Sequence, residues 1–229
     1  MKKGTINKLV TSHPNPTTYV FLDTCAILDV LRLPAKYENK FSMLSNYRDL
    51  IAKVNHGDAV LVTSCMTYVE LQSNKKNAIQ TETDWENSLT KDLHYYEGFA
   101  REAGLIAGNG ISATYDATDL MDHLNDMYNE LTRRIIYLPE KLKYDKFAME
   151  RVANRIPPAM GKTEYKDCYI WNTCMDFALS VKPADRIFFF TTNKKDFVVD
   201  PRGQYGNQFQ RDASNVDIYV DISALMQVV

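Results

Sequence analysis

Four acidic residues lie behind predicted strands or near the start of a predicted helix, where the active sites of parallel sheets are commonly found. Asp23 directly follows the apolar run TYVFL, Glu70 comes about two helical turns after AVLVT, and Asp196 follows IFFFTT by a few residues. Asp167 lies near the start of a helical pattern at 164–179. Open parallel sheets bind their ligands at the carboxyl ends of the strands. We therefore expect these four carboxylates to meet at one edge of a sheet.

The four acids together predict a site for a hard divalent cation. Taken singly, Asp23 and Asp167 can favour helix N-termini, and Asp196 can begin a turn. Glu70 is harder to explain in this way, because an acid close to a core-facing stripe needs a counter-charge. Clustered carboxylates repel one another unless a cation neutralises them, and oxygen ligands suit hard ions. The cluster therefore predicts Mg²⁺ or Mn²⁺ as cofactor.

Other chemistries lack their residues. The GK dipeptide of AMGKTEY follows two prolines rather than a strand, and no GxGxxG is present, so a phosphate-cradling nucleotide site is not expected. The histidines lack the HxxxH spacing of zinc hydrolases, and they do not form a triad pattern. These histidines are His13, His56, His94 and His123.

The elements that must position the acids form an α/β pattern. Strands are predicted at 18–22, 59–63, 187–192 and 216–220, separated by helical stretches without tight hairpin signals. Ser64 is expected to cap the helix after the second strand. This order favours a three-layer α/β/α fold with a central parallel sheet of four to five strands. The first and third strands should be adjacent, because otherwise Asp23 and Asp196 could not share a metal.

The middle of the chain predicts a helical insertion. A single domain over 1–229 is expected, with the insertion at about 80–155 and a loop at 104–118. The stretch DLMDHLNDMYNELTRRIIYL is typical of an amphipathic helix. Its apolar stripe is formed by Leu120, Leu124, Met127 and Leu131.

Composition is that of an ordinary folded domain. Of 229 residues, 45% are hydrophobic and 24% charged, which disfavours disordered and disulfide-scaffold classes. The longest apolar runs have four residues, and the N-terminus has no secretory pattern, so we expect a cytoplasmic protein without membrane contact. The cysteines have no CxxC spacing, which favours reduced core thiols. They are Cys25, Cys65, Cys168 and Cys174.

Charge is segregated although the net charge is only −2. Residues 82–130 hold eleven acids and two bases, whereas residues 133–166 hold nine bases and four acids. Bases interleaved with aromatic residues are typical of single-strand nucleic-acid grooves. The alternative is an internal clasp between the basic and acidic segments. The candidate substrate-binding lysines are Lys141, Lys143, Lys146, Lys162 and Lys166, with Lys194 and Lys195 beside the third strand.

Four short motifs carry a family resemblance. FLDTCAIL, VTSCMTYVEL, KDCYIW and FFFTTNKKDF resemble, in order, the four motifs of PIN domains, over residues 18–75 and 160–222. PIN domains are metal-dependent nucleases and include the toxin ribonucleases of toxin–antitoxin pairs. The resemblance implies that Asp23, Glu70, Asp167 and Asp196 are the catalytic and metal-binding acids.

The resemblance leaves the fourth ligand open between Asn193 and Asp196, because many relatives have an aspartate close behind the strand. The stretch IPPAMGKTEYKDCYIW is similar to a PIN-like subgroup, in which Glu164 joins the metal ligands; its alternative role is that of an acid in a helix's first turn. Thr24, Thr191 and Asn193 are candidates to orient the ligands or the scissile phosphate.

The mechanism implied is metal-assisted hydrolysis of a phosphodiester without a protein nucleophile. We expect Asp23 and Asp167 to hold the principal ion, with Glu70 and Asp196 completing the site. RNA is the favoured substrate, which makes the chain an endoribonuclease with a toxin or defence role and an antitoxin or another protein as partner. The alternatives are a catalytically silent scaffold that binds a protein, and a structure-specific DNA nuclease.

Overall fold

The centre of the fold is a parallel sheet with strand order β1-β4-β3-β2-β5-β6. The computed structural model describes residues 2–3, 9, 11–12, 17–36, 42–102, 117–160, 164–198 and 207–229. The strands are β1 (Lys2–Lys3), β2 (Thr18–Leu22), β3 (Ala59–Ser64), β4 (Ile136–Leu138), β5 (Arg186–Phe190) and β6 (Val216–Tyr219). Every pair in the sheet is parallel, and β2 lies between β3 and β5. The predicted fold class and the adjacency of the first and third predicted strands are confirmed.

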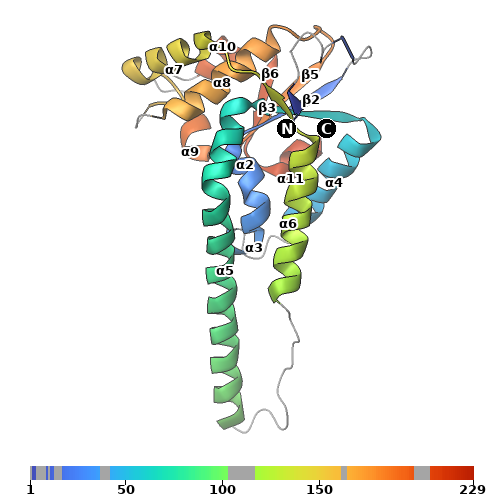
Figure 1. The fold of residues 1–229 in the computed structure, drawn as a ribbon, viewed down its shortest axis with the longest axis vertical. Helices are drawn as coiled ribbons and strands as arrows, with labels where there is room; N and C mark the ends of the chain where they lie inside the picture. Colours follow the sequence, from blue (N-terminus) through green and yellow to red (C-terminus); the bar gives the residue numbers. More distant parts are fainter. Residues whose placement is uncertain are drawn as a thin grey trace.

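Helices cover both faces of the sheet and complete the three layers (Figure 1). They are α2 (Thr24–Leu28), η1 (Asp29–Arg32), α3 (Leu33–Lys36), α4 (Ser42–His56), α5 (Cys65–Glu102), α6 (Ala117–Arg134), α7 (Leu142–Asn154), α8 (Tyr165–Ala178), α9 (Lys194–Phe197), α10 (Gln208–Asp212) and α11 (Ile222–Met226). Within the described residues, no helix is both long enough and apolar enough to cross a membrane.

Strand alternation divides the core between the two faces, because successive side chains of a strand point to opposite sides. On one face Val20 and Leu22 pack with residues of α2, η1, α4, α6 and α11. On the other face Tyr19 and Phe21 pack with α8, through residues such as Trp171, and with α9 and α10. The four β2 side chains named here are at most 1% exposed. The central strand is therefore held in place by packing on both faces, which also fixes the position of Asp23 directly behind it.

The segment between β3 and β5 differs in part from the sequence expectation. Helices α5 and α6 extend away from the sheet with α2 and α3 between them (Figure 1). Residues 136–138, predicted to continue a helix within the insertion, instead form β4 and pair with Val62, Thr63 and Ser64. The loop predicted at 104–118 falls mainly on residues outside the described part of the chain.

Helix α5 buries two acids where it packs against the short helices. Glu82 and Glu86 are 0% and 6% exposed. The backbone N–H of Ala35 donates to Glu82 Oε2 at 3.2 Å, whereas no described residue is hydrogen-bonded to Glu82 Oε1 or Glu86 Oε1. Burial, opposed by the Ala35 N–H and reinforced by the Glu86 charge, raises the pKa of Glu82 to about 7. The fold therefore favours the protonated form of Glu82.

We expect Glu82→Gln to stabilise the protein at pH 8 by about 1–3 kcal/mol and to change little at pH 4. A carboxyl whose pKa is raised by folding stabilises the folded state only while it is protonated. Its contribution is therefore lost as the pH rises from the ordinary value of 4.5 to about 7. Urea unfolding at several pH values measures the effect, with the exposed Glu150→Gln as control. Equal pH profiles for Glu82→Gln and the unmodified chain would contradict this explanation.

Candidate active site

Asp23 lies at the carboxyl end of the central strand, where β2 passes into α2. Its Oδ1 accepts a hydrogen bond from the N–H of Thr24 at 2.7 Å, so the residue caps the helix as well as facing the sheet edge. Its Oδ2 accepts from the Thr191 hydroxyl at 2.7 Å and from the Cys25 thiol at 2.9 Å. Burial raises the pKa of Asp23, the Cys25 and Thr191 hydrogen bonds oppose this, and the Glu70 charge adds to it.

Glu70 reaches the same edge from the second turn of α5. The expected cap is present, because Ser64 Oγ accepts from the N–H of Met66 at 3.2 Å where the helix leaves β3. The Thr24 hydroxyl donates to Glu70 Oε2 at 2.5 Å. Lys166 Nζ lies 3.4 Å from Glu70 Oε1. The counter-charge that an acid in this position requires is therefore supplied from α8.

Asp167 lies in the first turn of α8 and faces the end of β5. Asn193 Nδ2 lies 3.2 Å from Asp167 Oδ2 and 2.8 Å from Asp196 Oδ2, so one amide donates to both carboxylates. Burial, and after it the negative charges of neighbouring acids, together raise the pKa of Asp167 to about 8. The acids that contribute are Asp23, Glu70, Glu164 and Asp196. All the predicted acids therefore act electrostatically on one carboxyl group.

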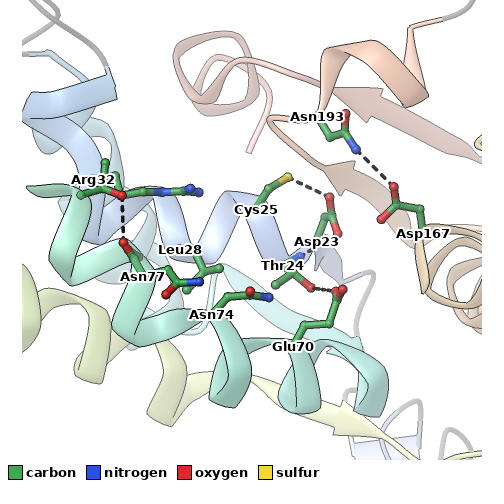
Figure 2. A pocket seen from close by; sticks show the side chains of 12 residues that line it. Asp23, Thr24, Cys25, Leu28, Arg32, Glu70, Asn74, Asn77, Asp167 and Asn193 are labelled. Atoms are coloured by element: carbon green, nitrogen blue, oxygen red, sulfur yellow. Dashed lines mark hydrogen bonds between the residues drawn. The ribbon is translucent and has the colours of Figure 1, made fainter. Parts of the chain in front are cut away.

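A pocket of ≈ 370 Å³ joins these groups. Figure 2 shows the Asp23, Glu70 and Asp167 side chains around it, with Asn193 beside Asp167. Its lining residues are Asp23, Thr24, Cys25, Leu28, Arg32, Glu70, Asn74, Asn77, Ala78, Thr81, Asp167 and Asn193. Asp196, Glu164 and Thr191 are not part of this lining. In the part of the chain that the structure describes, no group of three or more His, Cys, Asp or Glu side chains stands ready to hold a metal ion.

Comparison with known proteins agrees with this geometry. A family model described as PIN domain matches residues 20–197, which include every residue that lines the pocket. This chain belongs to the PIN domain family. No curated protein and no solved structure matches it. PIN domains are usually nucleases that act on nucleic acid, and they generally use divalent metals.

The basic residues predicted to bind substrate do not all lie near the pocket of this PIN domain. Lys141 and Lys143 pair with Asp176 near the C-terminal end of α8, and the Tyr144 hydroxyl donates to the same carboxylate. Burial alone would raise the pKa of Asp176, but hydrogen bonds from Lys141, Lys143 and Tyr144 lower it to about 2. Since Asp176 lies nine residues from Asp167, about 13 Å along α8, these lysines stand apart from the pocket.

These two lysines therefore form an electrostatic clasp with Asp176, and among the described acids at 82–130 none forms an ion pair with them. Among the other candidates, Lys166 contacts Glu70, whereas Lys146, Lys194 and Lys195 are exposed. Lys162 lies outside the described residues.

Several residues that line the pocket of this PIN domain were not predicted from the sequence. Cys25 was expected to be a core thiol, but it lines the pocket and contacts Asp23; burial and the Asp23 charge raise its pKa far above the ordinary value. The other three cysteines are buried, and all four are unpaired thiols, as expected. Arg32, Asn74 and Asn77 were also missed. The available signal was their spacing, because positions 70, 74, 77 and 81 share one face of a helix.

Proposed function

We propose that this chain is a single PIN domain over residues 1–229 that hydrolyses RNA internally with Mg²⁺ or Mn²⁺. The observation that carries the proposal is the pocket at the carboxyl edge of the sheet, where Asp23, Glu70 and Asp167 converge from three different elements. Carboxylates crowded in this way favour a bound cation, because burial and mutual repulsion both disfavour their charged forms.

The residues present fit a divalent ion by the chemistry of their donor atoms. Mg²⁺ and Mn²⁺ prefer oxygen ligands. Asp23, Glu70 and Asp167 would hold the ion, with Asp196 or the Asn193 carbonyl oxygen as the fourth ligand. Glu164, which stands at the N-terminal boundary of α8, would act on the site through its charge. When bound, such an ion stabilises charge on phosphoryl oxygens and lowers the pKa of water.

The side chains around the acids would orient them. Thr191 and Cys25 hold one oxygen of Asp23, and Thr24 holds one oxygen of Glu70. Residues that support metal ligands in this way fix the direction of the lone pairs. Cys25 is unsuited to nucleophilic attack, because the raised pKa keeps its thiol protonated. The protonated thiol is consistent with the proposed mechanism, in which a water molecule is the nucleophile.

We expect the purified chain to cut labelled single-stranded RNA internally in Mn²⁺ or Mg²⁺. Cleavage should stop in EDTA and return when Mn²⁺ is added in excess, because the acids alone supply no counter-charge for the phosphate. Gel electrophoresis of RNA labelled at either end, with DNA of the same sequence in parallel, measures this. Preferred cleavage of DNA would favour the DNA nuclease, and no cleavage with any metal would favour the non-catalytic scaffold.

A role as a toxin or defence effector, with an antitoxin or another protein as partner, remains a prediction. The gene neighbourhood tests it, because an antitoxin gene would be expected beside this one.

A further inference from the structure

The pocket continues beyond the acids as a trough between two helical walls. One wall is a face of α5 with Glu70, Asn74 and Asn77, which are spaced i, i+4 and i+7. The other wall has Thr24, Leu28 and Arg32, spaced i, i+4 and i+8 along α2 and η1. Asn77 lies seven positions after Glu70 on α5, so the trough runs about 10 Å from the acids.

The two ends of the trough differ in charge. Asp23, Glu70 and Asp167 make the first end anionic, and Arg32 is the charged residue of the lining at the other end. Arg32 Nη2 and Lys36 Nζ both contact Asp29, at 2.7 and 2.6 Å, and Asp29 is 0% exposed. A single buried carboxylate thus fixes two cations, and the group keeps a net positive charge beside the trough.

The amide groups of Asn74 and Asn77 face the same space. Figure 2 shows both side chains projecting from α5 toward α2, on the side where the Arg32 guanidinium lies. Within the described residues no hydrogen bond engages either amide group. Leu28 and Ala78 add apolar surface to the lining. The trough therefore offers a cation, paired donors and acceptors, and an apolar contact surface within one narrow space.

We infer that this trough binds the nucleotide next to the scissile phosphodiester of single-stranded RNA, with Arg32 on a phosphate and Asn74 and Asn77 on a base edge. The inference rests on the proposed function for the position of the scissile bond. Carboxamides pair with the donor and acceptor groups of bases, and unstacked single-stranded bases expose those edges. A guanidinium suits phosphate oxygens. A volume of ≈ 370 Å³ is in the range of small-ligand pockets, which suits nucleotides rather than a duplex.

Base preference tests the role of the two amides. In an Asp23→Asn background, short fluorescent RNA homopolymers of the four bases are titrated by anisotropy. The parent should prefer one base, and Asn74→Ala/Asn77→Ala should reduce that preference about tenfold. Gln72→Ala/Gln80→Ala removes two exposed amides of α5 that do not line the pocket, and it should change nothing. A parent without base preference, or a preference that the asparagine variant retains, would overturn the inference.

Salt dependence tests Arg32 separately. Arg32→Gln should lower the logarithmic salt slope of RNA binding by about 0.7, the value for one phosphate contact on a single strand. Arg32→Lys should keep the slope, and Lys76→Gln, an exposed change on α5, should not alter it. An unchanged slope in Arg32→Gln with a lower melting temperature would mean that Arg32 only anchors Asp29, which would overturn its assigned role.

These measurements separate the inference from the proposed function. The variants could leave base preference and salt slope unaltered while the parent cleaves RNA with metal. That result would support the proposed function and refute the subsite. The variants could instead alter RNA binding while the parent fails to cleave RNA with any metal. That result would support the subsite and refute the proposed nuclease activity. Tighter binding of the matching DNA oligonucleotides would overturn RNA as the ligand.

Discussion

Asp23→Asn should reduce RNA cleavage to background, by more than about 100-fold, while the protein stays folded. A loss of 10- to 100-fold is typical for residues that only support a metal ligand, so a ligand itself should exceed it. Asp23 is the residue on which this expectation rests most directly, because it ends the central strand, lines the pocket and is only 2% exposed. Its replacement removes negative charge where the proposed cation must bind.

The same substitution should leave the free energy of unfolding unchanged or increased. Burial raises the pKa of Asp23, so the folded state favours its neutral form, and asparagine resembles that form. Asparagine is also a good helix N-cap, and its oxygen can still accept from Thr24 N–H. The Thr191 hydroxyl and Cys25 thiol can rotate to accept from the new amide. Activity and stability therefore change in opposite directions, as is common at active sites.

Cleavage assays in Mn²⁺ and urea unfolding of the same preparation measure the two effects. Asp49→Asn is a matched control, because it removes one exposed carboxylate on α4 outside the pocket. It should change neither quantity. Normal cleavage by Asp23→Asn would refute the proposed mechanism, and an unfolded Asp23→Asn would show that Asp23 is required for the fold.

The strands around Asp23 were predictable because each is a short apolar run with a polar residue directly behind it. β2 has the predicted bounds, and β5 and β6 differ only at their ends. β4 was missed because its three residues continue an amphipathic helical pattern, and periodicity cannot separate a short buried strand from such a helix. Ile136 to Leu138 become a strand because β3 offers them an open edge to pair with, and this partner is distant in the sequence.

The positions of two acids in the pocket could be predicted from their local patterns, because Asp23 directly follows an apolar strand and Asp167 stands near the start of an amphipathic helix. Asn74 and Asn77 were not predictable in this way, because neutral amides on a helix surface are common and only the opposite wall makes them part of a trough. Lys141 and Lys143 show the opposite error, in which the sequence suggested a functional role and the structure shows an ion pair. Their density in the sequence suggested a substrate groove, but the partner that binds them, Asp176, could be found only from the packing of α7 on α8.

Helix α8, which carries Asp167, is held in place by a buried ion pair. Arg151 of α7 is 8% exposed and donates to the carbonyl of Pro157 and to Asp212 Oδ2. Trp171, one turn after Asp167, donates from Nε1 to the same Oδ2 at 3.0 Å. The carboxylate of Asp212 thus joins α7, α8 and α10 through two donors, with side chains of the ion pair only 10% exposed.

Asp212→Ala should lower the free energy of unfolding by about 3–5 kcal/mol, the cost of leaving one member of a buried ion pair without its partner. Arg151 would keep its charge away from water, and Trp171 would lose its acceptor. The double variant Arg151→Met/Asp212→Asn should recover most of this loss, because it removes the buried charge and leaves an oxygen for Trp171. Urea unfolding of the single and double variants measures both the loss of stability and its recovery. Equal destabilisation in the two would mean that packing around Arg151, rather than its unpaired charge, sets the loss of stability.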